Sequence, residues 1–171
     1  MRSQMYVPPL SKFNKILIIT YVALFLLGKI LAGSGISLVS ILALSSGGFK
    51  SGMIFQLITY PFIDTQFMSV LFNALILWFI GSELESKWSG KFYLKFLAIV
   101  TYVPGILFLL TGLFVGKSMN FVPYHGLNGL NLGLLVAYAM VYSERTMLFM
   151  FIFPMKAKYF CLLLAVIEMY M

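Results

Sequence analysis

Long apolar stretches recur along this chain, and they constrain its fold more than any other feature. Five of them cover residues 16–32, 67–80, 96–115, 126–142 and 159–171. Of the 171 residues, 61% are hydrophobic and 10% are charged, whereas a soluble domain carries about 25% charged residues. A water-soluble surface cannot be made from this inventory. The sequence therefore predicts an all-α, polytopic membrane helix bundle whose first partner is the lipid bilayer.

Two parts of the chain differ from this pattern. The connection 33–66 holds apolar pieces at 36–44 and 53–62 that are too short to span, which indicates a structured loop in the membrane interface. The last stretch, 159–171, reaches only about 20 Å, against a hydrocarbon core of about 30 Å. We therefore expect about five spanning helices and a chain that is truncated at its C-terminus.

The basic residues predict the orientation of the chain. They gather in residues 2–15, 87–95 and 145–158, which lie on one side of the membrane if each of the first four stretches crosses it. Apart from Lys29, which lies near the far end of the first stretch and can reach the headgroups, the other side holds only Lys50 and Lys117. By the positive-inside rule, the three basic segments and the N-terminus are cytoplasmic.

These charges also bear on domains, partners and location. We expect a cytoplasmic segment at 1–14 and one membrane domain at 15–171. The net charge of +7 then reflects orientation, and no nucleic-acid partner is expected because no basic soluble face with interleaved aromatics is present. One cysteine and one histidine cannot build a metal site, so no metal or cofactor is expected. The basic-inside pattern favours a multi-pass protein of a bacterial plasma (inner) membrane.

A glycine-rich stretch, HGLNGLNLG, opens the fourth apolar segment at residues 125–133. Gly129 and Gly133 form a Gly-x-x-x-Gly pair, and such pairs let transmembrane backbones approach closely. In the fold that the resemblance described below implies, the pair would seat this helix against the second and fifth helices. Asn128 stands between Gly126 and Gly129, where a nucleophile would be sought.

Asparagines at two sites would place amides inside an apolar bundle. Asn73 lies within the second stretch and Asn128 at the start of the fourth. An amide buried without a partner costs about 1–3 kcal/mol. We therefore expect these two amides to bond each other, Ser69 or water.

Several motifs follow one another in a suggestive order. The segment 55–62 (FQLITYPF) precedes Asn73, then Gly81 and Glu85 follow, and Gly-Leu-Asn-Gly comes at 126–129. These resemble, in turn, the tryptophan-arginine loop, the His-x-x-x-Asn helix, the Gly-x-x-x-Glu turn and the Gly-x-Ser-Gly motif of rhomboid intramembrane serine proteases, the peptidase S54 type. The resemblance implies six helices around a short fourth helix with a re-entrant outer loop, of which the sixth helix is missing here.

The resemblance also implies a proteolytic mechanism, but the residues at the matching positions cannot carry it out. In active members a serine attacks the peptide carbonyl, a histidine on the sixth helix takes its proton, and a histidine and an asparagine on the second helix hold the oxyanion. Here Asn128 fills the nucleophile position, while Ser69 and Asn73 fill the oxyanion positions. A carboxamide is no activated nucleophile, and losing nucleophile or base costs about a million-fold in rate in serine proteases.

We therefore predict a pseudoprotease that keeps the scaffold but does not carry out intramembrane proteolysis. It is a candidate for binding other transmembrane proteins. Its structural residues would be glycines and one acid: Gly81, Glu85, Gly126, Gly129 and Gly133. The alternatives are a rhomboid endopeptidase that is degenerate or represented by a fragment, and a decayed gene product without function.

Three other residues have two readings each, and Asp64 has one. A Ser69–His125 dyad is conceivable, but a histidine that caps the start of the fourth helix is favoured. Glu168 is an acid in an apolar run, a functional candidate by default, yet its closeness to the chain end favours truncation. Glu85 would pair with a neighbouring lysine or tether a loop. Asp64 would be solvated in the outer loop.

Overall fold

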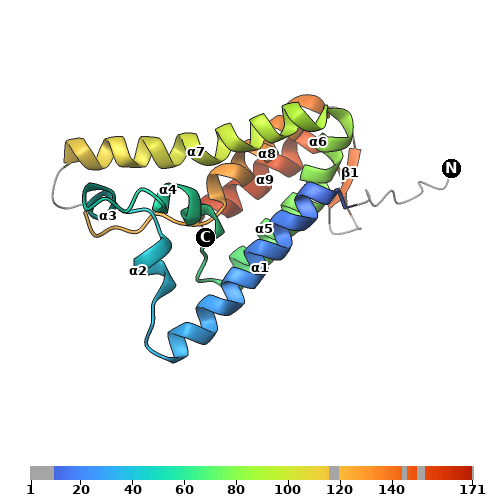
Figure 1. Ribbon diagram of the computed structural model, residues 1–171. Coiled ribbons are helices and arrows are strands. Elements are labelled where there is room, and N and C mark those ends of the chain that lie inside the picture. Colours follow the sequence, from blue (N-terminus) through green and yellow to red (C-terminus); the bar gives the residue numbers. More distant parts are fainter. Residues whose placement is uncertain (1–9, 116–119, 144–145, 150–152, 171) are drawn as a thin grey trace.

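The computed structural model of the chain describes residues 10–115, 120–143, 146–149 and 153–170 (Figure 1). Within these ranges the chain is almost entirely helical, as the sequence predicts. The elements in chain order are α1 (Lys12–Gly33), α2 (Leu38–Leu42), α3 (Ser46–Lys50), α4 (Gln56–Thr59), the 3-10 turn η1 (Tyr60–Phe62), α5 (Phe67–Ile76), the π-helical turn η2 (Leu77–Gly81), α6 (Ser82–Lys87), α7 (Gly90–Val115), α8 (Asn128–Val141), the strands β1 (Thr146–Phe149) and β2 (Phe153–Lys156), and α9 (Ala157–Tyr170).

Three helical segments in the described part of the chain are long and apolar enough to cross a membrane. They are α1 with 22 residues, the continuous run α5–η2–α6 with 21 residues, and α7. A span needs about 20 residues because a helix rises about 1.5 Å per residue. Helices α8 and α9 have 14 residues each, which corresponds to about 21 Å. The all-α membrane bundle is thus confirmed, and three of the five expected spans have full length.

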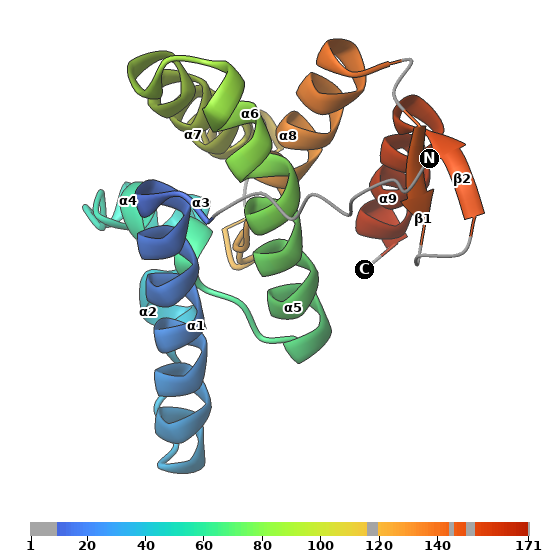
Figure 2. The same cartoon turned by 90° about the vertical axis from the view of Figure 1, so that its right-hand side faces the viewer.

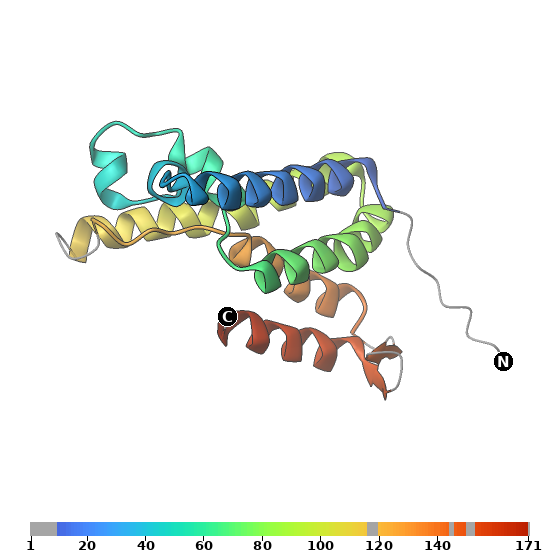
Figure 3. The same ribbon diagram turned by 90° about the horizontal axis from the view of Figure 1, so that it is seen from below.

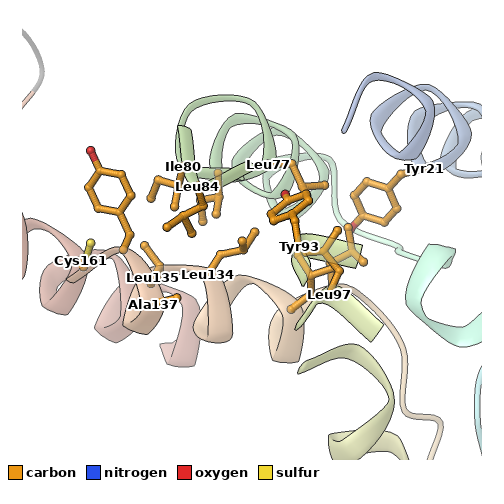
Figure 4. Packing of buried hydrophobic residues seen from close by; sticks show 14 of the residues in the cluster. Tyr21, Leu77, Ile80, Leu84, Tyr93, Leu97, Leu134, Leu135, Ala137 and Cys161 are labelled. Atoms are coloured by element: carbon orange, nitrogen blue, oxygen red, sulfur yellow. The ribbon is translucent and has the colours of Figure 1, made fainter. Parts of the chain in front are cut away.

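Helix α8 occupies the centre of the bundle. Figure 3 shows α8 between α5 and α9, and Figure 2 shows α9 with the β1–β2 hairpin on the side of α8 that faces away from α1. Leu134 and Tyr138 of α8 are fully buried, and they share one core with Leu77 of η2 and Tyr93 of α7 (Figure 4). The core therefore forms where the short central helix meets two of the long ones.

Two glycines set the distance between α8 and α7. A β-carbon at Gly129 would lie 2.8 Å from Cγ of Pro104, and one at Gly133 would lie 2.6 Å from Cγ1 of Val100. Side-chain carbons do not approach so closely, so this spacing requires glycine. Helix α8 does pack on the second span and on α9, as expected, but the glycine pair itself faces α7, the third span.

The connection between α1 and α5 is a folded loop that carries α2, α3, α4 and η1. Leu44 and Tyr124 form an isolated antiparallel bridge, with N–O distances of 2.9 and 2.7 Å. The Tyr60 hydroxyl donates to the Thr101 carbonyl of α7. The loop is therefore docked both on α7 and on the segment that leads into α8.

Gln56 holds the interior of this loop together. Its side chain is 1% exposed. Nε2 donates to the Ile41 carbonyl at 3.1 Å, and Oε1 accepts from the Ser45 backbone N–H at 3.2 Å. One amide thus satisfies backbone groups on both sides of a turn, which lets the turn be buried.

The bundle's two ends differ in charge. Lys12 begins α1, Lys87 ends α6 and Lys91 is the second residue of α7, and these three ends of helices lie at one end of the bundle, which we call the basic end (Figure 1). Lys50 lies in α3 at the opposite end, which we call the loop end. This grouping is the one expected from the sequence, and the side of the membrane stays a prediction. Arg2, Lys117 and Arg145 lie outside the described residues.

Candidate functional site

Five hydrogen-bonding side chains from different parts of the chain meet inside the otherwise apolar bundle. We call them the polar cluster: Tyr21 of α1, Asp64 of the loop, Ser69 and Asn73 of α5, and Asn131 of α8. Polar groups inside a membrane bundle are costly and mark candidate functional positions. The cluster is therefore the first place to look for function.

Asp64 is the acceptor at one end of the cluster. Its Oδ2 accepts from the Tyr21 hydroxyl at 2.6 Å and from the Ser69 hydroxyl at 2.5 Å. Its Oδ1 accepts from the backbone N–H groups of Thr65 at 2.7 Å and Gln66 at 3.0 Å. The expectation of a solvated loop acid is wrong, because this half-buried carboxylate ties α1 to α5 and orders the start of α5.

The two buried amides continue the cluster into the bundle. Asn73 Nδ2 donates to Tyr21 at 2.6 Å and to Ser69 at 3.3 Å. Asn73 Oδ1 accepts from Nδ2 of Asn131, and both amides are 0% exposed. The donors therefore run in one direction, from α8 through α5 to the carboxylate of Asp64.

The glycine-rich stretch lies beside this carboxylate. Gly126 has φ +92°, a value that L side chains rarely adopt, and its N–H donates to the Tyr60 carbonyl at 3.1 Å. A β-carbon at Gly126 would be 3.7 Å from Oδ2 of Asp64. Asn128 begins α8 with an exposed side chain, so the amide that reaches Asn73 is that of Asn131.

The cluster has the contacts of a structural bridge. The Ser69 hydroxyl donates to Asp64 and accepts from Asn73. A serine nucleophile needs an imidazole or an equivalent base that is itself oriented by a third group. Within the described residues, the recorded partners of Ser69 do not include His125, the single histidine, which is half-buried before α8. The structure therefore does not form the conceivable Ser69–His125 dyad.

A second polar group lies at the basic end, around Gly81. The Tyr93 hydroxyl donates to Asn14 Oδ1 at 2.8 Å, and Asn14 Nδ2 contacts Ser82 Oγ at 3.4 Å and Glu85 Oε2 at 3.5 Å. A β-carbon at Gly81 would lie 2.7 Å from the Tyr93 hydroxyl. Glu85 therefore tethers α6 to the start of α1 through an amide.

Two loop tyrosines outside these polar groups have raised pKa values, and the described residues form no metal site. Burial raises the pKa of the loop tyrosines Tyr60 and Tyr124 above the ordinary range, which keeps both hydroxyls protonated at neutral pH. In the described part of the chain, no three histidine, cysteine or acidic side chains gather as a metal site would require. Glu168 lies in α9, but its side chain is outside the described residues.

Sequence reasoning found Ser69 and Asn73 but missed three members of the cluster. Tyr21, Asp64 and Asn131 were not assigned to it. Asn131 carried a usable signal, since it is an amide inside an apolar stretch, as Asn73 is. Tyr21 and Asp64 carried none, because only the fold brings their parts of the chain to α5.

A helical bundle with three full spans and a polar cluster that joins α1, α5 and α8 defines a polytopic integral membrane protein. The model of a family described as eukaryotic integral membrane protein (DUF1751) matches residues 15–171, and the chain belongs to this family. No curated protein matches the chain.

The family corrects two expectations from the sequence. Assignment to the rhomboid proteases is wrong, because the match is to a different, eukaryotic membrane family. Glycine and asparagine spacings do not identify a family by themselves, because small and polar residues mediate helix packing in membrane proteins of any fold. The bacterial plasma membrane is also wrong, since the family is eukaryotic. The positive-inside rule reports orientation and does not identify the organism.

Proposed function

We propose that this protein is a non-catalytic membrane scaffold that binds a transmembrane segment of another protein. Its binding site would be a pocket of about 180 Å³ that lies among α1, η1, η2, α7 and α8, and we call it the lateral pocket. Leu17 of α1, Phe62 of η1 and Ala98 of α7 line it. This pocket is the observation that carries the proposal.

The size and chemistry of the lateral pocket fit one apolar side chain. Apart from Thr101 and Tyr102, its lining residues are apolar, and none is charged. An apolar cavity of roughly 150 Å³ holds a molecule the size of benzene. A leucine or phenylalanine that projects from a neighbouring helix would therefore fill it, whereas a long acyl chain would fill it with only a fraction of its length.

The pocket is also accessible from the side of the bundle. Leu94 is 40% exposed and Ala98 is exposed, so this wall of α7 faces the surroundings of the bundle. The polar cluster supports the non-catalytic part of the proposal, because its hydroxyl and amide groups bond one another. The scaffold would therefore present shape, without an activated nucleophile.

Photocrosslinking in native membranes tests the proposal. A benzoyl-phenylalanine at position 99, an exposed residue of α7 beside the pocket but outside its lining, is expected to crosslink to a discrete protein in the full chain. Ala98→Phe, which fills the pocket, should abolish this crosslink and the copurification of that protein. The matched control is position 23, where Ala23 is an exposed residue of α1 outside the pocket lining. Lipid adducts alone at both positions, or the same protein captured at both, would refute the lateral pocket as a binding site.

A further inference from the structure

A pocket of about 710 Å³ opens in the folded loop, between α2, α3 and the residues that precede Tyr124, and we call it the loop pocket. We propose that it binds the phosphate group of an anionic phospholipid. It shares no lining residue with the lateral pocket, so the two proposals are independent.

The charge of the loop pocket favours an anion. Among the described residues that line it, Lys50 is the only charged one. Its Nζ donates to Oδ1 of Asn120 at 3.2 Å, and the partner is a neutral amide. An ammonium group has three donors, so this contact leaves it able to bind an oxyanion. A cation without an adjacent carboxylate attracts negative charge into the pocket.

The lining also brings further hydrogen-bonding groups to the pocket. Ser40, Ser45 and Ser51 place hydroxyl groups around the pocket. They donate to the Ser37 carbonyl, Gln56 Oε1 and the Gly47 carbonyl, so a bound phosphate would take over these donors by rotation of the hydroxyl groups. Gln56 lies in its floor at 1% exposure and is fixed by the Ile41 carbonyl. Because this floor is already ordered, a ligand would not have to organise it, which reduces the cost of binding.

The rim of the loop pocket favours a lipid as the source of the phosphate. Phe121 is 91% exposed and Met53 is 39% exposed, and both line the pocket. Ile54 next to it is 63% exposed. The loop joins two membrane-spanning segments, α1 and α5, so its apolar rim lies at the level of the lipid interface. A phosphate in the polar floor would then leave the acyl chains against the rim.

Binding of a short-chain lipid to the purified full chain tests the proposal. In an uncharged detergent, dihexanoylphosphatidic acid is expected to bind, and Lys50→Gln should weaken its affinity about tenfold, since one charge-assisted hydrogen bond is lost. Lys91→Gln removes the same charge at the basic end and should leave affinity unchanged. Ser40→Trp keeps Lys50 but fills the pocket, and should weaken binding as well.

Separate arms identify the ligand. Inorganic phosphate and neutral dihexanoylglycerol should each bind more weakly than dihexanoylphosphatidic acid. Equal affinity for inorganic phosphate would remove the lipid from the proposal, and equal affinity for dihexanoylglycerol would remove the phosphate. If a folded Lys50→Gln protein, with an unliganded melting temperature like that of the wild type, bound the lipid as tightly as the wild type, the loop pocket would not be the site.

Discussion

Asn131 donates a side-chain hydrogen bond to Asn73, and so joins α8 to α5 at a point where both amides are 0% exposed. The surrounding contacts are apolar and carry little directional information. A buried amide that loses its partner costs about 1–3 kcal/mol. The pair therefore fixes the rotation of the central helix against its neighbour.

Replacing one amide should destabilise the bundle. Asn131→Leu leaves Asn73 Oδ1 without this donor, so we expect the free energy of unfolding to fall by about 1–3 kcal/mol, measured by steric trapping in bicelles. Asn128→Leu is the matched control, because Asn128 is exposed, and it should change stability by less than about 0.5 kcal/mol. The double variant Asn73→Leu/Asn131→Leu should cost less than the sum of its parts. Equal effects at 128 and 131 would contradict the pairing.

Filling the glycine face of α8 should separate α8 from α7. Gly133→Leu drives a side chain into Val100, whose Cγ1 is 2.6 Å from the position of the added β-carbon. Such overpacking costs about 1–3 kcal/mol, measurable as loss of monodisperse protein and a lower melting temperature. Val100→Ala should restore part of the loss.

The control for this substitution is Gly33→Leu at the end of α1, where no atom lies within 4 Å of the added β-carbon. It should leave the melting temperature unchanged. If Gly33→Leu were as damaging as Gly133→Leu, close packing of α8 on α7 would not explain the loss.

The polar group at the basic end should show coupling between Gly81 and Tyr93. Gly81→Ala places a β-carbon 2.7 Å from the Tyr93 hydroxyl and 3.1 Å from Nδ2 of Asn14. We expect each of Gly81→Ala and Tyr93→Phe to cost about 1 kcal/mol or more. Because Tyr93→Phe removes the colliding oxygen, the double variant should lose less than the two single variants together. A strictly additive cycle would show that the two positions do not meet.

Loss of the Gln56 amide should open the loop locally. Gln56→Leu removes the acceptor of the Ser45 N–H and the donor to the Ile41 carbonyl. Hydrogen exchange at Ser45 should accelerate by about tenfold or more, which corresponds to at least 1.4 kcal/mol of local opening, while exchange in α7 should stay unchanged. Gln66→Leu, at an exposed position, is the control. Unchanged exchange in Gln56→Leu would show that other contacts order the turn.

The membrane class and most of the fold followed from the sequence. Apolar stretches of sufficient length placed α1, the α5–η2–α6 run and α7, because hydrocarbon requires a long apolar helix with its backbone bonds satisfied internally. The short apolar pieces in the connection after α1 predicted a structured loop, and that loop is folded. The shortness of the last apolar stretch was attributed to the end of the chain. Helix α8, which lies inside the chain, is equally short, since α8 and α9 have 14 residues each.

The candidate site was predicted only in part. Asn73 and Ser69 were identified because polar residues stand out within an apolar stretch. The partner of Asn73 was expected to be Asn128 and is Asn131, three residues later on α8. Three residues rotate an α-helix by about 300°, so the side chains of Asn128 and Asn131 point about 60° apart. That angle separates the exposed amide from the buried one. Asp64 was expected in solvent because the sequence does not show that Tyr21 and Ser69 donate to its carboxylate.

The sequence by itself determined the solvent of this protein, its helical class and the grouping of its basic residues. The tertiary structure decided which faces of those helices meet: that Gly129 and Gly133 lie on α7, and that Tyr21 and Asp64 complete a cluster begun by Asn73. The physical reason is that lipid-facing and helix-facing residues are both apolar, so composition marks what enters the membrane and leaves the pairing open. Only close packing at glycines and hydrogen bonds between buried polar groups distinguish one pairing from another.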